Sequence, residues 1–182
     1  LTAKIAYLIS RKNVKPDHIL ALTFTNKAAR ELEQRIDQYL PETKVPVLAA
    51  TFHSFCLKLL KEYKGFNATI ADEPLRISMI REAMGKTAKK GMVNKIDQLI
   101  SRCKQNLLGP DDDLGTLKPD VEPDQLKKIY QTYQTLCREQ AVVDFEDLIL
   151  LTFKLLFKNE RILSCVLKQY QYIFIDEYQD LN

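Results

Sequence analysis

Segments with helical spacing alternate with short apolar runs in the first third of the chain. The apolar run at 18–25 shows no regular polar alternation, which is typical of a strand buried on both faces of a parallel sheet, and the run at 47–52 predicts another strand. Around these runs, apolar residues recur at helical spacing at 1–10, 27–40 and 54–63. The resulting order of helix, strand, helix, strand, helix predicts parallel strands joined by helical crossovers.

The middle of the chain, from residue 72 to about residue 139, shows helical spacing only. Three helices are expected there, near 73–84, 90–107 and 124–139, separated by polar segments rich in turn-forming residues. Because this all-helical block lies between two α/β stretches, it is most simply an insertion.

The last part of the chain returns to the earlier pattern. Helices are expected at 144–158, with Asp144 as the N-cap, and at 160–169. The unbroken apolar run Tyr172–Ile175 then predicts a third strand, again buried on both faces.

Together these patterns predict an α/β protein with a mostly parallel sheet and an all-helical inserted subdomain. Residues 1–71 and 141–182 would form the core domain, and residues 72–140 would form the insertion. Lysines and arginines outnumber acids eight to two between Arg76 and Lys104. That stretch could contact a polyanion, or it could simply be the solvated face of amphipathic helices.

Composition narrows the class of protein without identifying it. The 182 residues carry a net charge of +3, which permits a local basic patch but does not require a polyanionic partner. The four cysteines are scattered without metal-ligand spacing, which indicates free thiols in a reducing compartment. The longest apolar stretch, 148–157, is too short to span a bilayer, and no signal peptide opens the chain. A cytoplasmic protein without a membrane partner is expected.

Two acids follow the last predicted strand. Asp176 and Glu177 would lie at the carboxyl end of a parallel strand, where open α/β sheets bind their ligands. In nucleotide hydrolases, one acid at this position holds Mg²⁺ and a neighbouring acid acts on the attacking water. The alternative interpretation is that both are solvated charges where the strand leaves the core.

The two earlier strands also end in polar, hydrogen-bonding residues. The segment Thr23–Lys27 combines hydroxyls, an amide and a lysine, which suit a phosphate backbone, and Phe24 could stack on a base. Thr51, His53 and Ser54 repeat this chemistry after the next strand. The alternative is a core phenylalanine, an N-cap formed by Asn26, and a capping or core histidine.

The segment Gly85-Lys86-Thr87 superficially resembles the end of a phosphate-binding loop. Such a loop needs a glycine five residues before its Gly-Lys pair and a strand ahead of it. Ile80 occupies that position, and a helix is expected to precede the segment. We therefore expect no nucleotide phosphate loop in this chain.

Four segments carry a family resemblance: TFTNKAARELEQRI, ATFHSFCLKLL, VDFEDLI and YIFIDEYQDLN. In this order and spacing they resemble the first motor domain of superfamily-1 DNA helicases of the UvrD/Rep kind. The resemblance implies a partial RecA-like P-loop NTPase fold, ATP and Mg²⁺ as cofactors, and 3′-to-5′ movement on single-stranded DNA in repair or replication.

The resemblance also implies roles for individual residues. Asp176 and Glu177 would bind the metal, Glu177 would act on the hydrolytic water, Gln179 would sense the nucleotide state, and Asp180 would help hold that loop. The single strand would follow a path lined by residues of both strand-end segments: Thr23, Phe24, Thr25, Asn26, Lys27, Thr51, His53 and Ser54.

The resemblance further implies that the chain is part of a longer protein. The phosphate loop would precede Leu1, and a second motor domain, which supplies arginines to the ATP site, would follow Asn182. We expect the fragment alone to be inactive as an ATPase, because losing such an arginine costs about 10³-fold or more in rate. Single strands and single/double-strand junctions would be the partners of the whole protein. Two alternatives remain open: a single-strand binding module without chemistry, and the motor subunit of a helicase–nuclease complex.

Overall fold

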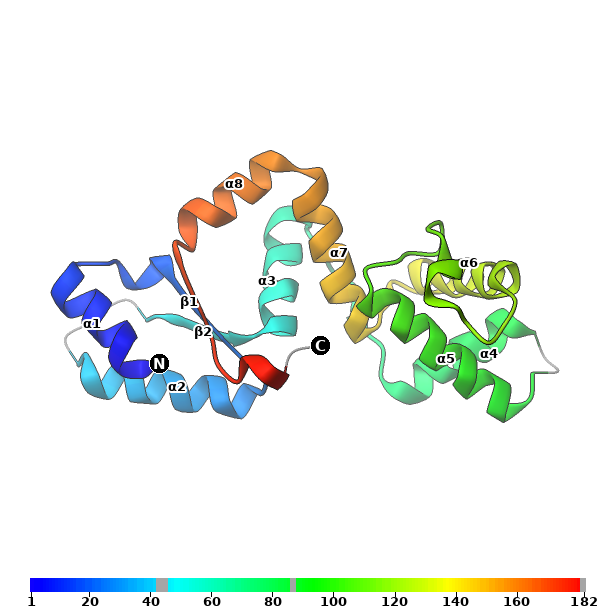
Figure 1. Cartoon of the computed structure of the whole chain (residues 1–182), viewed down its shortest axis with the longest axis horizontal. Helices are drawn as coiled ribbons and strands as arrows, with labels where there is room; N and C mark the ends of the chain where they lie inside the picture. The colour runs from blue at the N-terminus through cyan, green and yellow to red at the C-terminus, as the bar shows by residue number, and fades with distance from the viewer. Residues whose placement is uncertain (42–45, 86–87, 181–182) are drawn as a thin grey trace. The chain divides into compact units, whose positions relative to one another are not determined.

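The computed structural model describes residues 1–41, 46–85 and 88–180, apart from the side chain of Asp180 (Figure 1). The chain forms two compact units, Leu1–Leu59 with Leu155–Asn182, and Leu60–Lys154. Helices and a small parallel sheet confirm the α/β class. The predicted domain boundaries, before residue 72 and after residue 140, both fall inside the second unit.

The first unit is built on three parallel strands in the order β2–β1–β5. These are β1 (Ile19–Thr23), β2 (Leu48–Thr51) and β5 (Tyr172–Ile175). Every residue of the central strand β1 is buried, as its apolar sequence predicts. Because all three strands run in the same direction, their carboxyl ends lie at one edge of the sheet.

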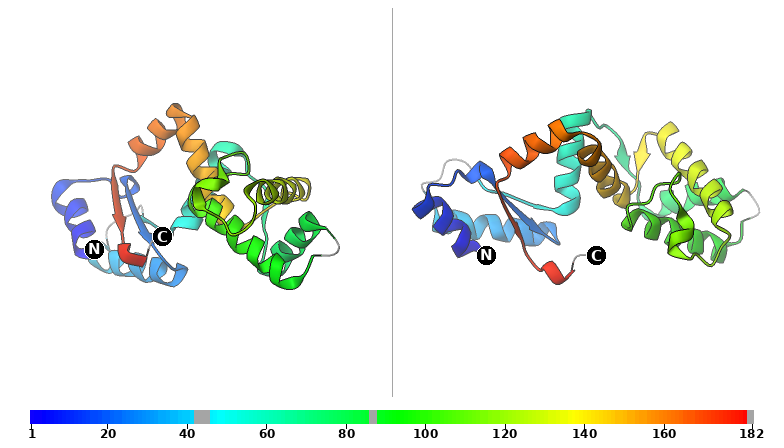
Figure 2. Two further views of the ribbon diagram at one scale, coloured as in Figure 1. Left: turned by 45° about the vertical axis from the view of Figure 1, so that its right-hand side comes forward. Right: turned by 45° about the horizontal axis from the view of Figure 1, so that its top comes forward.

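Helices cover the sheet of this unit (Figures 1 and 2). The helices α1 (Thr2–Lys12) and α2 (Asn26–Tyr39) pack together on one side, where Ile5, Leu32 and Ile36 meet Ile19 and Ala21 of β1. A 3-10 helix (Pro16–His18) leads from α1 into β1.

The helix α3 (Phe52–Lys64) begins in this unit, and α8 (Glu160–Gln169) precedes β5. Tyr170, the C-cap residue of α8, contacts two residues of α3. Its ring packs edge-on against Phe55 at a centroid distance of 5.3 Å, and Lys58 Nζ donates to its hydroxyl at 2.7 Å.

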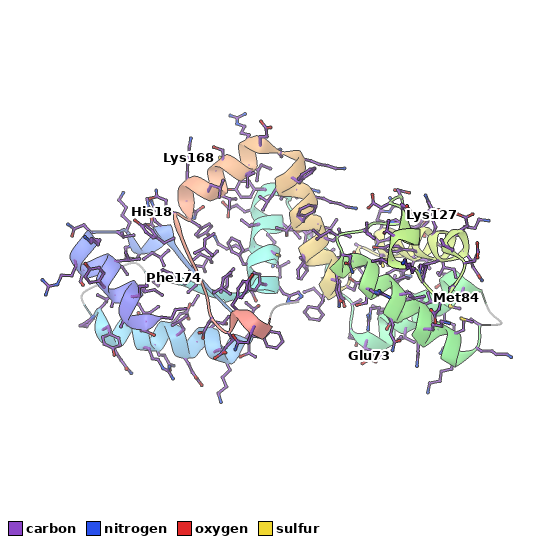
Figure 3. The ribbon with its side chains drawn as sticks, in the orientation of Figure 1. His18, Glu73, Met84, Lys127, Lys168 and Phe174 are labelled. Atoms are coloured by element: carbon purple, nitrogen blue, oxygen red, sulfur yellow. The ribbon has the colours of Figure 1, made fainter. Side chains whose placement is uncertain are left out.

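The prediction that the last strand is buried on both faces is wrong. Within the described part of the chain β5 pairs only with β1, and so forms an edge of the sheet. Tyr172 and Ile173 are consequently 38% and 52% exposed, whereas Phe174 and Ile175 are partly buried. Figure 3 shows Phe174 on the side of the sheet that faces α1 and α2.

The second unit is mainly helical. It contains α4 (Glu73–Met84), α5 (Lys90–Gln105), a 3-10 helix (Leu114–Leu117), α6 (Pro123–Glu139) and most of α7 (Phe145–Lys158). Their common core holds Ile80, Ile96, Ile100, Tyr130 and Tyr133, each almost wholly buried. The predicted helices of the insertion are therefore confirmed, to within a few residues at their ends.

A second, very short parallel sheet brackets this helical segment, and the sequence did not predict it. It consists of β3 (Thr69–Ile70) and β4 (Val142–Val143). The amide of Thr69 donates to the carbonyl of Ala141 at 2.9 Å, and that of Ala71 to the carbonyl of Val143 at 2.7 Å. Strands of two residues are too short to show a periodic pattern, which explains the miss.

Candidate functional site

The parallel register brings the predicted motif segments together at one sheet edge. Thr23, the last residue of β1, is paired with Thr51, the last residue of β2. On the other side, Leu22 is paired with Ile175, and the amide of Asp176 donates to the carbonyl of Leu22 at 2.8 Å. The acidic pair and both polar junctions therefore leave the sheet at the same end, as parallel topology predicts.

The backbone turns sharply at the acidic pair. Asp176 is partly buried directly after β5, and Glu177 is exposed with φ at +50°. This left-handed region costs an ordinary L-residue about 1–2 kcal/mol. A 3-10 helix (Tyr178–Asp180) follows immediately. Stored backbone strain of this kind clusters at ligand-binding and catalytic positions.

Gln179 holds the carboxylate of Glu177. Its Nε2 donates a hydrogen bond to Glu177 Oε2, so the glutamate side chain is oriented by the residue two positions further on. The side chain of Asp180, to which the family resemblance also gives a role in this loop, lies outside the described residues.

The acidic pair fits one kind of magnesium site. Among the described residues, no group of three or more His, Cys, Asp or Glu side chains could hold a metal ion. Magnesium commonly takes only one or two carboxylates and completes its shell with water and substrate phosphates. Asp176, at the strand end, suits an ion that is shared with a phosphate rather than an ion enclosed by protein ligands alone.

The start of α2 is capped by Thr25, and the assignment of Asn26 as the N-cap is wrong. Thr25 has extended backbone angles and its Oγ1 accepts from the amide of Ala28 at 3.1 Å. The free amide in the first turn of α2 is therefore satisfied by Thr25, one residue before the predicted cap Asn26. Thr23, only 1% exposed, supports this turn by donating from Oγ1 to the carbonyl of Thr25 at 3.0 Å.

Three neighbouring side chains at this junction reach solvent. Phe24 is 65% exposed, so the alternative interpretation of a core phenylalanine is wrong. The side chain of Lys27 is 87% exposed and forms a long ion pair, 3.8 Å, with Glu31 one turn along α2. Asn26 is also exposed. An aromatic face, an amide and an ammonium group are thus available beside the amino end of a helix, whose field favours anions.

The second junction forms a hydroxyl network that reaches the first. Thr51 is 8% exposed; its Oγ1 accepts from the amide of Ser54 at 3.1 Å and donates to Ser54 Oγ at 2.9 Å. Ser54 Oγ in turn donates to Asn26 Oδ1 at 3.5 Å. His53, between them, is partly buried. The two predicted DNA-binding segments are therefore joined by the side-chain hydrogen bond from Ser54 to Asn26.

Sequence reasoning missed a buried ionic cluster in the second unit. The Nζ of Lys104 contacts Oδ2 of Asp144 and lies 2.8 Å from Oδ1 of Asp147. Tyr133 donates to Asp144 Oδ2 at 2.8 Å, and Gln134 donates to Asp147 Oδ1 at 3.0 Å. Both acids belong to the VDFEDLI segment, but nothing in the local pattern marks the lysine, forty residues earlier, as their partner.

The cluster also fixes the start of α7. Asp144 is its N-cap, as predicted: Oδ1 accepts from the amide of Asp147 at 2.9 Å, and Asp147 Oδ2 accepts from the amide of Asp144 at 3.2 Å. Burial would lower the pKa of Lys104, but the two carboxylates outweigh it and raise that pKa. Burial would raise the pKa of Asp144, but Lys104 outweighs it and lowers that pKa. Lys104 and Asp144 are therefore held in their charged forms, whereas burial and the nearby charge of Asp144 raise the pKa of Asp147.

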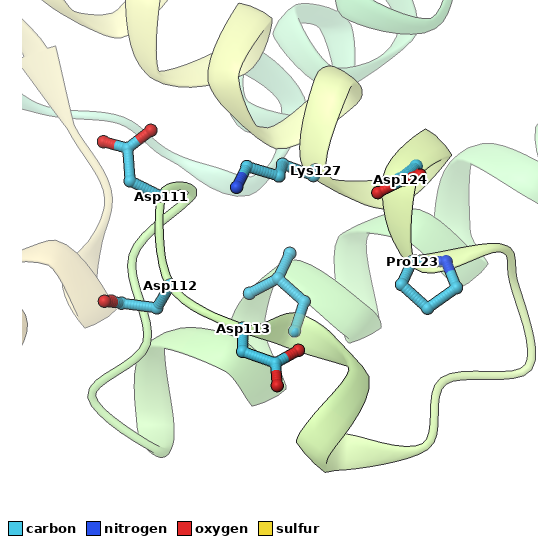
Figure 4. Close-up of a pocket in the computed structure, with 7 residues that line it drawn as sticks. Asp111, Asp112, Asp113, Pro123, Asp124 and Lys127 are labelled. Atoms are coloured by element: carbon cyan, nitrogen blue, oxygen red, sulfur yellow. The ribbon is translucent and has the colours of Figure 1, made fainter.

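An open pocket of about 280 Å³ lies elsewhere in the second unit (Figure 4). Asp111, Asp112 and Asp113 line it from one segment, and Asp124 and Lys127 line it from α6. Two of these acids already serve the local turn, because Asp112 Oδ2 accepts from the amide of Gly109 at 2.6 Å and Asp113 Oδ1 from that of Gly115 at 3.0 Å. This pocket is far in sequence from the strand-end motifs and shares none of their residues.

No helix within the described ranges has the length and apolar character needed to cross a membrane.

Comparison with known proteins agrees with the geometry. The model of the UvrD/REP helicase N-terminal domain matches residues 1–182. The chain is 34% identical over 190 residues to the ATP-dependent DNA helicase PcrA of Bacillus subtilis and 33% identical to PcrA of Staphylococcus aureus. It is also 33% identical over 194 residues to a probable DNA helicase II homolog of Mycoplasma capricolum.

Each comparison covers 100% of this chain but only 26–27% of the relative, so the chain spans about a quarter of the length of these proteins. The match runs through the acidic pair and both strand-end junctions. The chain belongs to the UvrD/REP helicase N-terminal domain family.

Proposed function

We propose that this chain is the first motor segment of an ATP-dependent DNA helicase that moves 3′-to-5′ along a single strand and unwinds duplexes in repair or replication. The observation that carries the proposal is the single sheet edge at which an acidic pair and two polar junctions meet. In a motor, the state of the bound nucleotide must change the affinity for the nucleic acid, and two sites at one end of the same sheet can be coupled in this way.

The acidic pair would serve ATP hydrolysis. Asp176 would hold Mg²⁺ together with the outer phosphates of ATP, and the ion would neutralise charge that develops on those phosphates. Glu177 would contribute to the metal shell and orient or deprotonate the attacking water. Gln179, which already hydrogen-bonds Glu177, would transmit the state of the nucleotide.

The two junctions would serve the single strand. Phe24 offers a face on which a base can stack, and Asn26 and Lys27 offer donors to the phosphate backbone. Thr25 and Thr23 would hold this turn, and the segment Thr51–Ser54 would continue the path. The buried hydroxyls of Thr23 and Thr51 are occupied by protein partners and would act from behind the contact surface.

A complete ATP site would also need a phosphate-binding loop and a second motor domain. The sequence contains no glycine-rich loop ending in Lys-Ser or Lys-Thr of the phosphate-binding type, so a RecA-like ATP site would need residues beyond this segment. We therefore expect no ATP turnover from residues 1–182 alone. A second motor domain of the same protein would complete the site, and residues 72–140 would form the subdomain that flanks the DNA near a single/double-strand junction, in the cytoplasm.

A binding titration tests the DNA half of the proposal directly. We expect a labelled single-stranded oligonucleotide to show salt-dependent anisotropy changes with this chain, because phosphate contacts release counterions. Replacing Phe24 by alanine should weaken binding by about 5- to 100-fold, the loss expected for one stacked base.

Tyr39 supplies the matched control. It is 63% exposed at the far end of α2, away from the junction that holds Phe24. Tyr39→Ala should leave the affinity unchanged. Equal binding by the wild-type and Phe24→Ala chains would contradict the proposed path.

A further inference from the structure

We propose that Ser54 is a positioning residue for DNA binding, which holds the side-chain amide of Asn26 with its Nδ2 group directed to the phosphate backbone. The inference rests on the proposed function of the sheet edge as a single-strand path. It assigns Ser54 an action through Asn26, where the family resemblance implies only that both residues line the path.

The hydroxyl of Thr51 begins a series of hydrogen bonds that runs to Asn26. A threonine hydroxyl has one proton to donate. At 2.9 Å it is donated to Ser54 Oγ, while the same Thr51 oxygen accepts from the backbone amide of Ser54 at 3.1 Å. Thr51 is 8% exposed whereas Ser54 is exposed, so the donor of this bond is its buried end. Its direction is therefore set from the buried side.

Ser54 is the second member of this series of hydrogen bonds. Because Ser54 Oγ accepts from Thr51, its own proton is left for another acceptor. The neighbouring atom is Asn26 Oδ1, at 3.5 Å. The chain of donation thus runs outward from Thr51 through Ser54 to Asn26, and successive hydrogen bonds in one direction reinforce one another.

The side-chain amide of Asn26 is the last group in this series of hydrogen bonds. An asparagine side chain can present either its oxygen or its nitrogen to a ligand. With Oδ1 accepting from Ser54, Nδ2 is the group left for a partner, and the next residue in the sequence is the exposed Lys27. A phosphodiester accepts hydrogen bonds but has none to donate, so this orientation matches it and the reverse orientation would oppose it.

The expected gain is that of holding one side chain in its bound orientation before the ligand arrives. Such preorganisation corresponds to about 2- to 10-fold in affinity. No charge is involved, so the salt dependence of binding should not change when Ser54 is replaced.

A double-mutant cycle on the affinity for a labelled single-stranded oligonucleotide tests the inference. We expect Ser54→Ala to weaken binding by about 2- to 10-fold at unchanged salt slope, and Ser54→Thr, which keeps the hydroxyl, to restore most of it. In an Asn26→Ala background, Ser54→Ala should have no further effect, because the group it orients is gone.

The control is Ser10→Ala, which removes an exposed helical serine whose Oγ donates only to its own helix, at 2.8 Å from the carbonyl of Ala6. It should bind like the wild type. Full affinity of Ser54→Ala, or an equal loss in the Asn26→Ala background, would overturn the inference, even where Phe24→Ala upholds the DNA path. Absence of wild-type binding would overturn both.

Discussion

The ammonium group of Lys104 lies 2.8 Å from Oδ1 of Asp147, and neither side chain reaches solvent: they are 0% and 3% exposed. The rings of Tyr133 and Tyr130 face the same ammonium group at 5.0 and 5.8 Å. A lysine is almost never buried in this way unless it is paired. Its charge is shared between two carboxylates at the first turn of α7, so one side chain from α5 fixes where α7 begins.

Replacing Lys104 by methionine should destabilise the second unit severely. The substitution keeps the apolar stem but leaves two carboxylates buried without their cation, and breaking a buried pair costs about 3–5 kcal/mol. Urea unfolding followed by circular dichroism measures the loss.

Lys95→Met is the matched control for this prediction. Lys95 pairs with Asp120 at 2.7 Å, but the two side chains are 36% and 70% exposed. Removing such a surface pair should cost about 1 kcal/mol or less. Similar losses for the two variants would contradict the special role of the buried cluster.

Acid should remove the contribution of Asp144. Burial opposes its charge, but Lys104 and the hydroxyl of Tyr133 favour it, so its folded pKa lies below the ordinary value of 3.8. A depressed carboxyl pKa stabilises the fold above the unfolded pKa, and this contribution is lost as pH falls through the folded pKa. The stability gap between wild type and Asp144→Asn should therefore be wide at neutral pH and should begin to close only as the pH falls below about 4, towards the folded pKa.

This gap can be followed by urea unfolding at several pH values. Asp120→Asn, at an exposed position, provides the comparison and should show a small gap throughout. A gap for Asp144→Asn that is independent of pH would show that the cluster acts by shape alone.

Glu177→Gln should separate binding from chemistry in a protein of the relatives' full length. The amide keeps the size of the side chain but cannot take a proton, and loss of a general base lowers turnover by about 10²–10⁴-fold. Binding of ATP and of single-stranded DNA should persist. Steady-state ATPase assays beside a binding titration measure both quantities.

Glu139→Gln, an exposed glutamate at the end of α6, is the control for this experiment and should hydrolyse ATP normally. Normal turnover by Glu177→Gln would remove Glu177 from the proposed mechanism and leave Asp176 as a metal ligand only.

The four thiols should differ sharply in reactivity. Cys165 is exposed, whereas Cys56, Cys103 and Cys137 are buried. Burial raises the pKa of the Cys103 thiol and raises that of Cys137 to about 11, which suppresses the reactive thiolate. A disulfide reagent should modify one thiol quickly in the folded protein, and the others only as it unfolds. Cys165→Ser should abolish the fast phase, and its survival would place another thiol at the surface.

Several helices were predictable from the helical spacing of their apolar residues, and side-chain caps at their first turns agree with the predicted starts. Asp72 and Asn159 accept from the amides of Leu75 and Ile162 at 3.0 and 3.2 Å, so α4 and α8 begin where the sequence predicts. The meeting of the motif segments at one sheet edge also followed from parallel strand order. In contrast, Ile173 is exposed because β5 is the outermost strand of the sheet. An apolar run does not reveal the position of its strand in the sheet.

The buried charge cluster could not be predicted for a different reason. Lys104 lies in a stretch that also holds exposed basic residues such as Arg81, Lys90 and Arg102, and only the tertiary fold separates it from them. The same limit applies to Ser54, whose contact with Asn26 spans 28 residues of sequence. Local patterns identify the residues of a site, but the partner that orients each one comes from packing.

The short β3–β4 ladder sets the path of mechanical load through the second unit. The chain enters β3 after α3 and leaves β4 into α7, and the two strands run in parallel. A pull applied between α3 and α7 therefore loads the hydrogen bonds of the ladder in shear, all at once, because each strand is pulled along its own axis. The helices α4 to α6 lie outside this path until the ladder breaks. In an optical trap with handles on α3 and α7, we expect the ladder to yield before these helices extend; the reverse order would show that tension runs through the helices instead.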